Sequence, residues 1–277
     1  MPEGPSFHHK KSLGQNFLSD RGILLAICRL AGLGEQDVVL EIGAGKGALT
    51  LALLESPCRL LYSVEIDRSL EPFLQDISLL HPGRLMMIWE DALSISFRSL
   101  APVPTKVVAN IPYNITTPLL WHLLKELAPA GTESFLVMVQ KEAAERLMAP
   151  AGTRRRSPLG VTLEAMGTLR SVLQVQAGAF RPRPSVDSSV LSFRPRDERR
   201  NLPDDPFWMD LLRAAFLQRR KKLVNKRRAR DGTRPWERFL EEAGIGANER
   251  AEEVSSSAWL VLREFFREGR AQKKASS

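Results

Sequence analysis

The stretch V-V-L-E-I-G-A-G-K-G-A-L-T, residues 38–50, decides the fold. Its first five residues, 38–42, form a short apolar run that is typical of a buried strand, and the pattern predicts a helix over about 46–55. The three glycines between them carry no Cβ, so the backbone there can turn sharply and approach a ligand closely. The stretch therefore predicts a strand, a glycine turn and a helix that together border a binding site.

Strands and helices continue to alternate on both sides of this unit. Such alternation predicts right-handed crossovers and a parallel sheet with helices on both faces, which is an α/β fold. Two closely spaced strand-like segments that follow the alternating part are expected to form an antiparallel pair and to complete a mostly parallel, seven-stranded sheet. The expected strands are 38–42, 60–66, 84–89, 106–110, 134–140, 171–177 and 188–194.

The composition changes near residue 197, which divides the chain into two expected domains. Residues 1–196 comprise a basic N-terminal arm and the α/β part, whereas R-D-E-R-R-N-L-P-D-D-P, starting at 196, reads as a linker. The segments after it have helical periodicity. We expect residues 197–277 to form a small, all-helical domain.

Composition and charge restrict the classes of function. The chain has 40 Lys and Arg against 32 Asp and Glu, a formal net charge of +8, which favours a polyanionic partner such as nucleic acid or an anionic membrane surface. No apolar run approaches the ~18 residues of a membrane span, and the first residues do not resemble a secretory signal. Two cysteines are too few for a disulfide scaffold or a structural zinc site, so we expect a reducing, cytoplasmic compartment and no metal.

Two acids that end successive strands indicate a nucleoside site beside the glycine turn. Glu65 lies 22 residues after Gly43, where an acid can accept hydrogen bonds from the ribose hydroxyls, and Asp91 is placed to meet an adenine amino group. The spacing is G-x-G-x-G rather than the G-x-G-x-x-G of dinucleotide folds, and Glu41 would repel a pyrophosphate. S-adenosylmethionine, which carries a sulfonium and an ammonium, fits this pattern better. The alternative is a turn whose glycines serve packing and whose acids cap helices.

The most specific chemical signal is A-N-I-P-Y-N-I, at the end of the strand expected over 106–110. Asn110 offers an acceptor oxygen, Pro112 biases the preceding residue toward an extended shape that leaves its carbonyl available, and Tyr113 offers an aromatic face. Together they could hold a planar base by its exocyclic amino group and orient its lone pair toward a methyl donor, so that catalysis is mainly positioning. The alternative is a strand-ending turn in which the asparagines satisfy the backbone.

These motifs occur in a familiar order. The segments H-K-K-S-L-G-Q-N-F-L, E-I-G-A-G-K-G, V-E-I-D, E-D-A, N-I-P-Y-N-I-T-T-P-L-L, F-R-P-R-P-S-V-D-S-S-V and A-F-L-Q-R-R-K-K-L-V-N follow one another. In them the chain resembles the rRNA adenine dimethyltransferases, most closely the small-subunit branch, over roughly residues 8–265. The resemblance implies a Rossmann-like class I methyltransferase fold. It also implies N6,N6-dimethylation of two adjacent adenosines in a hairpin loop near the 3′ end of small-subunit rRNA, with a late role in subunit assembly.

The resemblance also implies site residues. Those for S-adenosylmethionine are Asn16, Leu18, Gly43, Glu65, Asp91 and Asn110. Those for the target adenine are Asn110, Ile111, Pro112 and Tyr113, with Phe180 of F-R-P-R-P as a second stacking face. From the residues alone, Phe180 could also be a core residue that ends a strand.

One departure from the family pattern concerns the loop 150–158. The family usually has Tyr-Gly ahead of a strand-like segment that begins here with P-L-G-V, whereas this chain has Arg156 and Ser157. The arginines 154–156, together with Lys10, Lys11 and the segment 218–230, in which eight of thirteen residues are basic, could line a face that follows RNA phosphates. The alternative for the basic segment is a solvated helix face.

Other functions stay open at this point. The erythromycin-resistance methylases of the large-subunit branch share N-I-P-Y. A non-enzymatic ribosome-assembly factor, or a mitochondrial-type transcription cofactor, could use the same fold without catalysis, and a small-molecule N-methyltransferase would leave the basic segment unexplained. Nothing in the sequence requires more than a monomer.

Overall fold

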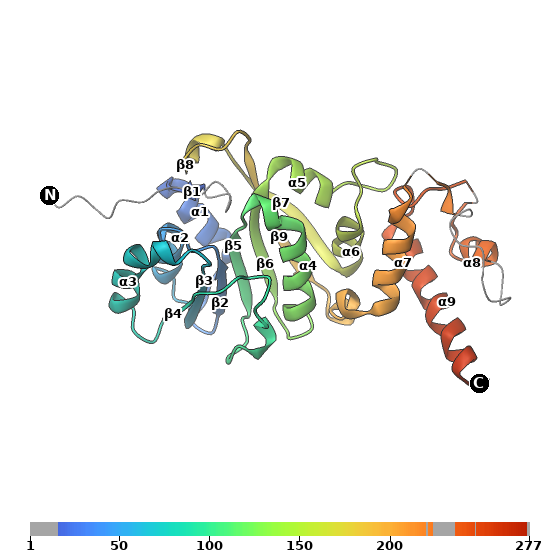
Figure 1. Cartoon of the computed structure of the whole chain (residues 1–277), viewed down its shortest axis with the longest axis horizontal. Helices are drawn as coiled ribbons and strands as arrows, with labels where there is room; N and C mark the ends of the chain where they lie inside the picture. The colour runs from blue at the N-terminus through green and yellow to red at the C-terminus, as the bar shows by residue number, and fades with distance from the viewer. Residues whose placement is uncertain (1–15, 220, 224–235, 247, 276–277) are drawn as a thin grey trace. The chain divides into compact units, whose positions relative to one another are not determined.

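The computed structural model of the chain describes residues 16–219, 221–223, 236–246 and 248–275. Figure 1 shows their elements in chain order. Lys10, Lys11 and most of the basic segment 218–230, which were predicted to face RNA, lie outside these residues.

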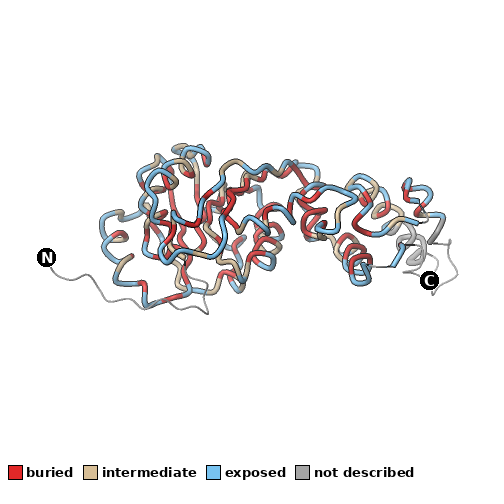
Figure 2. The backbone as a smooth tube through the Cα atoms, turned by 90° about the horizontal axis from the view of Figure 1, so that it is seen from above, coloured by how far each residue is buried: buried red, intermediate tan, exposed pale blue. Residues whose placement is uncertain are grey.

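Parallel strands form the centre of the sheet. Every residue of β2 and β3 is buried. Figure 2 colours the buried backbone of the chain red. Such near-continuous apolar runs are expected where helices cover both faces of a parallel sheet. The parallel strands are β2 (Val38–Ile42), β3 (Leu60–Val64), β4 (Leu85–Ile88), β5 (Lys106–Asn110) and β6 (Ser134–Gln140).

Two later strands complete this sheet. β9 (Ser188–Pro195) pairs antiparallel with β6, and β7 (Gly167–Val175) lies beyond it at the edge. The strand order is β4-β3-β2-β5-β6-β9-β7. The predicted α/β fold with a mostly parallel, seven-stranded sheet is therefore confirmed.

An α-helix precedes each of the parallel strands β2, β3, β4 and β6, as the alternating pattern predicts. The residues at both ends of the first helix explain where it begins and ends. The Asp20 side chain accepts a hydrogen bond from the N–H of Ile23 at its start, and Gly32, which has a positive φ, ends it. The helices of this part are α1 (Arg21–Ala31), α2 (Ala48–Leu54), α3 (Glu71–Leu80), α4 (Thr116–Leu127) and α5 (Lys141–Leu147). Short 3-10 turns are η2 (Arg68–Leu70), η3 (Phe97–Ser99), η4 (Tyr113–Ile115), η5 (Ala177–Ala179), η6 (Asp197–Arg199) and η7 (Leu202–Asp204).

The register of the central strands brings the predicted motifs to one edge. Ile42 of β2 pairs with Val64 of β3 on one side and with Ala109 of β5 on the other. The residues that follow these positions are the glycine turn, Glu65 and Asn110. Motifs far apart in the sequence thus lie at the same carboxyl edge of the sheet, where α/β folds bind their ligands.

A two-stranded ribbon lies outside the main sheet. β1 (Phe17–Leu18) pairs antiparallel with β8 (Phe180–Arg181), with Phe17 opposite Arg181 and Leu18 opposite Phe180. The ribbon joins the start of the described chain to the F-R-P-R-P segment.

The chain divides into two compact units. The first consists of Met1–Ala144 and Leu169–Pro195, and the second of Glu145–Thr168 and Arg196–Ser277. One break falls beside the domain boundary predicted after residue 196, but the segment 145–168 groups with the C-terminal helices. The helices of the second unit are α6 (Pro158–Met166), α7 (Pro206–Leu217), α8 (Trp236–Glu242) and α9 (Ser256–Ala275).

Helix α6 corrects the expectation of a strand-like segment at P-L-G-V. The Ser157 side chain accepts a hydrogen bond from the N–H of Gly160, and Pro158 occupies the first helical turn. Both are helix-start features. The helix is also anchored from its side, because Trp208 of α7 donates a hydrogen bond of 2.9 Å from Nε1 to Oγ1 of Thr162.

No helix in the described part of the chain is both long enough and apolar enough to cross a membrane.

Candidate active site

A cavity of about 250 Å³ opens at the carboxyl edge of the parallel strands. Its walls come from the glycine turn, the ends of β3 and β5, and the residues after β4. The lining residues are Asn16, Phe17, Ile42, Gly43, Gly45, Val64, Glu65, Ile66, Leu70, Glu90, Asp91, Ala92, Leu93, Asn110, Ile111, Pro112, Tyr113, Asn114 and Ile115. Most of the residues predicted to bind the cofactor or the target base are therefore brought together.

Gly43 and Gly45 occupy positions in the turn where a side chain would not fit. Gly43 and Gly45 have φ angles of +79° and +57°, which L side chains rarely adopt. A Cβ on Gly43 would lie 3.4 Å from the carbonyl oxygen of Asn110, and a Cβ on Gly45 would lie 2.8 Å from Cδ1 of Phe17. The glycines thus let the turn approach both β5 and β1.

Glu65 is held in place by backbone amides. Its Oε2 accepts a hydrogen bond of 2.9 Å from the N–H of Gly45, and its Oε1 accepts one of 2.9 Å from the N–H of Asp67. Burial raises the pKa of Glu65, and these hydrogen bonds oppose the shift. Since a carboxylate has about four acceptor positions, the fixed group can still accept hydrogen bonds from a diol.

Asp91 lies on the cavity wall as predicted. Its Oδ1 accepts a hydrogen bond of 2.9 Å from the N–H of Leu93, which fixes the carboxylate. Glu90, its neighbour in W-E-D-A, also lines the cavity, although the sequence reasoning did not select it. The cavity therefore has an acidic wall.

Glu41 lies beneath the turn and does not line the cavity. Its Oε2 accepts short hydrogen bonds from Thr50 (2.7 Å) and Ser63 (2.6 Å), and its Oε1 has no hydrogen-bond partner. Burial raises the pKa of Glu41 to about 7, with the hydrogen bonds opposing and the nearby charge of Glu65 adding to the shift. Through its hydrogen bonds with Thr50 and Ser63, Glu41 thus stabilises the turn that follows it.

The N-I-P-Y segment forms the opposite wall. Asn110 ends β5, Ile111 donates its N–H to the Met138 carbonyl oxygen at 3.1 Å, and the carbonyl oxygen of Pro112 accepts from the N–H of Ile115 at 3.2 Å. These bonds fix the turn. Burial raises the pKa of Tyr113, whose hydroxyl oxygen lies 3.0 Å from that of Ser188 in β9. Sequence reasoning did not find Ser188, because no local signal links the two segments.

Leu18 and Phe180 lie outside this first cavity. They face each other across the β1–β8 ribbon, and both belong to the hydrophobic core. The Phe180 side chain has 0% exposure, so in this arrangement its ring does not face the cavity. The structure therefore matches the alternative of a core residue, and a stacking role stays a prediction.

Arg156 corrects the prediction that all three arginines 154–156 face RNA. Its side chain has 0% exposure, and its Nη1 donates to Oε2 of Glu164 at 2.7 Å and to the carbonyl oxygen of Ala149 at 3.0 Å. The neighbouring Arg154 and Arg155 are exposed. Arg156 is buried because it ties the loop to α6 through Glu164, a contact that only the folded second unit supplies.

Among the described residues, no group of three or more His, Cys, Asp or Glu side chains is arranged to hold a metal ion.

The sequence profile of one family matches nearly the whole chain. It is described as ribosomal RNA adenine dimethylase and matches residues 6–268. The chain belongs to the ribosomal RNA adenine dimethylase family. This adenine dimethylase is therefore an enzyme of the class that methylates rRNA, and its family uses S-adenosylmethionine as the methyl donor.

Relatives of this adenine dimethylase include two proteins named Ribosomal RNA small subunit methyltransferase A. The one from Prochlorococcus marinus (strain MIT 9211) is 38% identical over 91% of this chain and 92% of its own. The one from Thermosynechococcus vestitus (strain NIES-2133 / IAM M-273 / BP-1) is 40% identical over 94% of this chain and 97% of its own.

Two solved structures resemble the adenine dimethylase in fold. A dimethyladenosine transferase from Plasmodium falciparum has a TM-score of 0.76 and 26% identity, covering 91% of this chain and 98% of its own. The 23S rRNA methyltransferase ErmE has a TM-score of 0.68 and 28% identity, covering 90% of this chain and 98% of its own.

Proposed function

We propose that this adenine dimethylase transfers two methyl groups from S-adenosylmethionine to N6 of each of two adjacent adenosines in a 3′-terminal hairpin loop of small-subunit rRNA. One observation carries the proposal: a single cavity is lined by Glu65 and Asp91 on one wall and by the N-I-P-Y segment on the other. The first wall suits an adenosyl group, and the second suits the amino group of a base.

The cofactor side of the cavity fits a cationic nucleoside. Glu65 accepts hydrogen bonds from the ribose hydroxyls, Asp91 accepts one from the adenine amino group, and Gly43 leaves room for close approach of the donor. When bound, S-adenosylmethionine supplies an electrophilic methyl group on a sulfonium. Asn16 lines the same cavity and completes the cofactor contacts there.

The N-I-P-Y side holds the reacting base. The side-chain oxygen of Asn110 and the carbonyl oxygen of Ile111 accept the two hydrogens of the N6 amino group, and Tyr113 stacks on the ring. Two acceptors orient the nitrogen lone pair at the methyl carbon, so that the N–C bond forms as the S–C bond breaks, in line. The methylated nitrogen is acidic and gives its proton to water, so no strong base is required.

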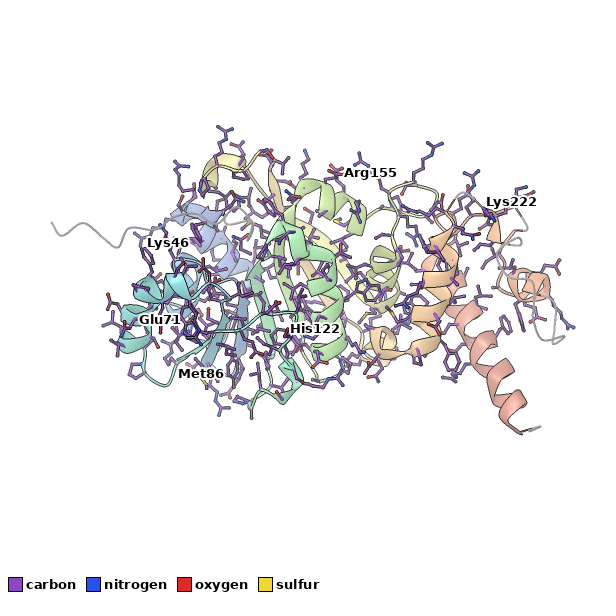
Figure 3. All side chains as sticks on the ribbon, viewed as in Figure 1. Lys46, Glu71, Met86, His122, Arg155 and Lys222 are labelled. Carbon is purple, nitrogen blue, oxygen red and sulfur yellow. The ribbon has the colours of Figure 1, made fainter. Side chains whose placement is uncertain are left out.

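The RNA lies outside the cavity and must present an unstacked base to it. Exposed cations of the second unit are suited to follow RNA phosphates, which position the substrate without reading its sequence. Figure 3 marks two of them, Arg155 and Lys222. The exposed cations on the described residues of the loop before α6 and of the segment after α7 are Arg154, Arg155, Arg219, Lys221 and Lys222.

The small-subunit branch is favoured over the large-subunit branch by the relatives. The two proteins named for the small subunit are 38% and 40% identical to this chain, whereas ErmE is 28% identical. We place the enzyme in the cytoplasm, acting as a monomer on precursors of the small ribosomal subunit.

The test is transfer of labelled methyl groups to undermodified small and large ribosomal subunits, presented separately. We expect label on two adjacent adenosines of the small-subunit rRNA, each carrying two methyl groups. Asn110→Ala is the matched variant, because it removes the acceptor but leaves the surface of the second unit intact. It should abolish transfer and retain RNA binding.

Label on the large subunit would instead support the erythromycin-resistance type of activity. Equal transfer by the Asn110→Ala variant would contradict the role of the N-I-P-Y wall. Failure to bind S-adenosylmethionine at all would favour a non-catalytic assembly factor.

A further inference from the structure

Ser188 contacts the hydroxyl end of Tyr113 from outside the cavity. It is fully buried and is not among the residues that line the first cavity, whereas Tyr113 is. The hydroxyl oxygens of the two residues lie 3.0 Å apart, which is within hydrogen-bond distance. A hydrogen bond at this end of the side chain opposes rotation about the Cα–Cβ bond of Tyr113, a rotation that would swing the ring.

The position of Ser188 is itself fixed by the strands around it. Ser188 begins β9 and pairs with Gln140, the last residue of β6. The carbonyl oxygen of Asp187, the preceding residue, accepts a hydrogen bond of 3.0 Å from the N–H of Lys141. The side-chain Oδ1 of Asp187 accepts another, of 2.9 Å, from the N–H of Ala177. The Ser188 hydroxyl is therefore a fixed anchor for the tyrosine.

The backbone of Tyr113 is held at the other end of the side chain. Tyr113 opens the turn η4, and its carbonyl oxygen accepts a hydrogen bond of 3.3 Å from Oγ1 of Thr116. With its backbone and its hydroxyl both hydrogen-bonded, the ring is preorganised on the cavity wall.

Two successive methyl transfers make different demands on this ring. The amino group of an unmodified adenosine has two hydrogens for the two proposed acceptors, the side-chain oxygen of Asn110 and the carbonyl oxygen of Ile111. After the first transfer a methyl group replaces one hydrogen, so only one of these hydrogen bonds can form. The stack on Tyr113 then carries a larger share of the positioning. Its accuracy matters, because a misplacement of about 1 Å can slow a reaction about 100-fold.

Resting on the proposed function, we propose that Ser188 is a positioning residue for the second methyl transfer and acts through Tyr113. It keeps the ring in the orientation at which N6 of N6-methyladenosine attacks the methyl carbon. The N–C bond forms as the S–C bond breaks, S-adenosylhomocysteine leaves, and the remaining N6 proton passes to water. Ser188 thereby favours dimethylated over monomethylated product.

Ser189, the next residue, provides a matched control. It is also buried, with 2% exposure, but its hydroxyl donates to Oε1 of Gln174 at 2.9 Å. Successive side chains of a strand point to opposite faces, so the two adjacent serines have different partners. Ser188→Ala and Ser189→Ala each remove one buried hydroxyl from β9, and a general effect on the strand should be the same for both.

The test separates the two products. Undermodified small subunits are incubated with S-adenosylmethionine, and N6-methyladenosine and N6,N6-dimethyladenosine are quantified over time in the digested rRNA. The time courses give the rate constants of the first and second transfers. The variants are Ser188→Ala, Ser189→Ala, Tyr113→Phe and the double variant Ser188→Ala/Tyr113→Phe. Thermal unfolding of each variant reports whether it is folded.

We expect the unaltered protein and Ser189→Ala to form mainly the dimethylated nucleoside. Because Ser188→Ala loses one hydrogen bond between neutral groups, it should slow the second transfer by about fivefold relative to the first, so that N6-methyladenosine accumulates. Tyr113→Phe removes the other partner of the same contact and should give the same product ratio. The double variant should match either single variant, because both changes remove one shared interaction.

Several results would overturn the inference. An unaltered product ratio in folded Ser188→Ala, or the same altered ratio in Ser189→Ala, would show that Ser188 only supports the strand. A larger change in the double variant than in the single ones would show that Ser188 does not act through Tyr113. If Ser188→Ala does not fold, an unaltered ratio in Tyr113→Phe refutes the proposal by itself. If the unaltered protein forms neither methylated nucleoside on the small subunit, the proposed function itself fails, which is distinguishable from all of these.

Discussion

The hydroxyl oxygens of Tyr113 and Ser188 lie 3.0 Å apart, and this contact joins the turn after β5 to strand β9. β6 lies between these two strands in the sheet, so the contact reaches across one strand. It fixes the orientation of the aromatic ring that we propose to stack on the target base. Burial raises the pKa of Tyr113, so the phenol stays neutral at neutral pH and can donate this hydrogen bond.

Removing the ring of Tyr113 should slow methyl transfer strongly. Stacking of a base on an aromatic side chain contributes about 1–3 kcal/mol, so Tyr113→Ala should lower kcat/KM for rRNA by roughly 10- to 100-fold. Tyr113→Phe is the matched control, since it keeps the ring and loses the hydroxyl. It should retain most of the activity in the same labelled transfer assay. Equal losses in both variants would show that the hydroxyl, rather than the stacking face, matters.

Glu65 is expected to hold both the cofactor and the glycine turn. Glu65→Ala removes the acceptors of the Gly45 and Asp67 amides as well as the ribose contact, so the dissociation constant for S-adenosylmethionine should rise by at least about tenfold. Glu90→Gln serves as the control, because Glu90 lines the same cavity. It should change the constant much less. An unaltered constant for Glu65→Ala, measured by calorimetry, would contradict the ribose contact.

Glu41 should make the stability of the protein depend on pH. A glutamate titrates near pH 4.3 in an unfolded chain, and burial raises the pKa of Glu41 to about 7 in the fold. Because the folded state binds this proton more tightly, the resulting stability is complete below about pH 4 and is lost as the pH rises through 7. Glu41→Gln cannot titrate and should not show this loss.

The measurement for Glu41 is urea unfolding of both proteins between pH 5 and pH 8. Over this range the free energy of unfolding of the unaltered protein should fall relative to that of Glu41→Gln, by up to roughly 3 kcal/mol. Parallel curves for the two proteins would show that Glu41 is ionised throughout.

Alanine substitutions at Gly45 and Gly83 separate the effect of the close contact between the turn and Phe17 from the effect of backbone strain. Gly45→Ala places a Cβ 2.8 Å from Phe17 at a φ of +57°, whereas Gly83→Ala adds one at a φ of +75° with no atom within 4 Å. Both variants should lose about 1–2 kcal/mol to the left-handed conformation. Gly45→Ala should lose a further 1 kcal/mol or so through overpacking and should weaken cofactor binding. Equal stabilities together with intact cofactor binding would show that Phe17 can move aside.

Arg154 and Arg155 should contribute to RNA binding, whereas Arg156 should not. The slope of log affinity against log salt is negative, and its magnitude rises with the number of phosphates that the protein neutralises. If each exposed arginine neutralises one phosphate, changing both to glutamine should reduce the magnitude of this slope by about two. Arg156→Met is the matched control: the guanidinium is buried, and its Nε and Nη2 have no hydrogen-bond partner. Filter binding at several salt concentrations gives the slopes. A slope of smaller magnitude for Arg156→Met would place this residue on the RNA-binding surface of the protein.

The parallel sheet could be predicted because its strands carry their own signals. Short apolar runs predicted β2, β5 and β6 with the bounds that the structure shows. Parallel pairing of these strands alone predicted that the motifs meet at the carboxyl edge of the sheet. The first wall of the cavity was thus predictable down to Glu65 and Asp91.

Features that depend on tertiary contacts were not predictable. Helix α6 contains Gly160, which reads as a helix breaker, yet a Cβ there would lie 2.8 Å from the carbonyl oxygen of Leu147. The glycine therefore permits close packing of α6 on the end of α5. In the same way, nothing local distinguishes Arg156 from its exposed neighbours, because Glu164 is what stabilises its burial.

The second unit is assembled from two pieces of chain, and this has a consequence for biosynthesis. Helix α6 leaves the ribosome long before α7, whose Trp208 hydrogen-bonds to Thr162. A nascent chain that has emerged only as far as β9 therefore displays the apolar side of α6 without its cover. Until translation supplies residues 196–277, the second unit lacks most of its chain and cannot assemble.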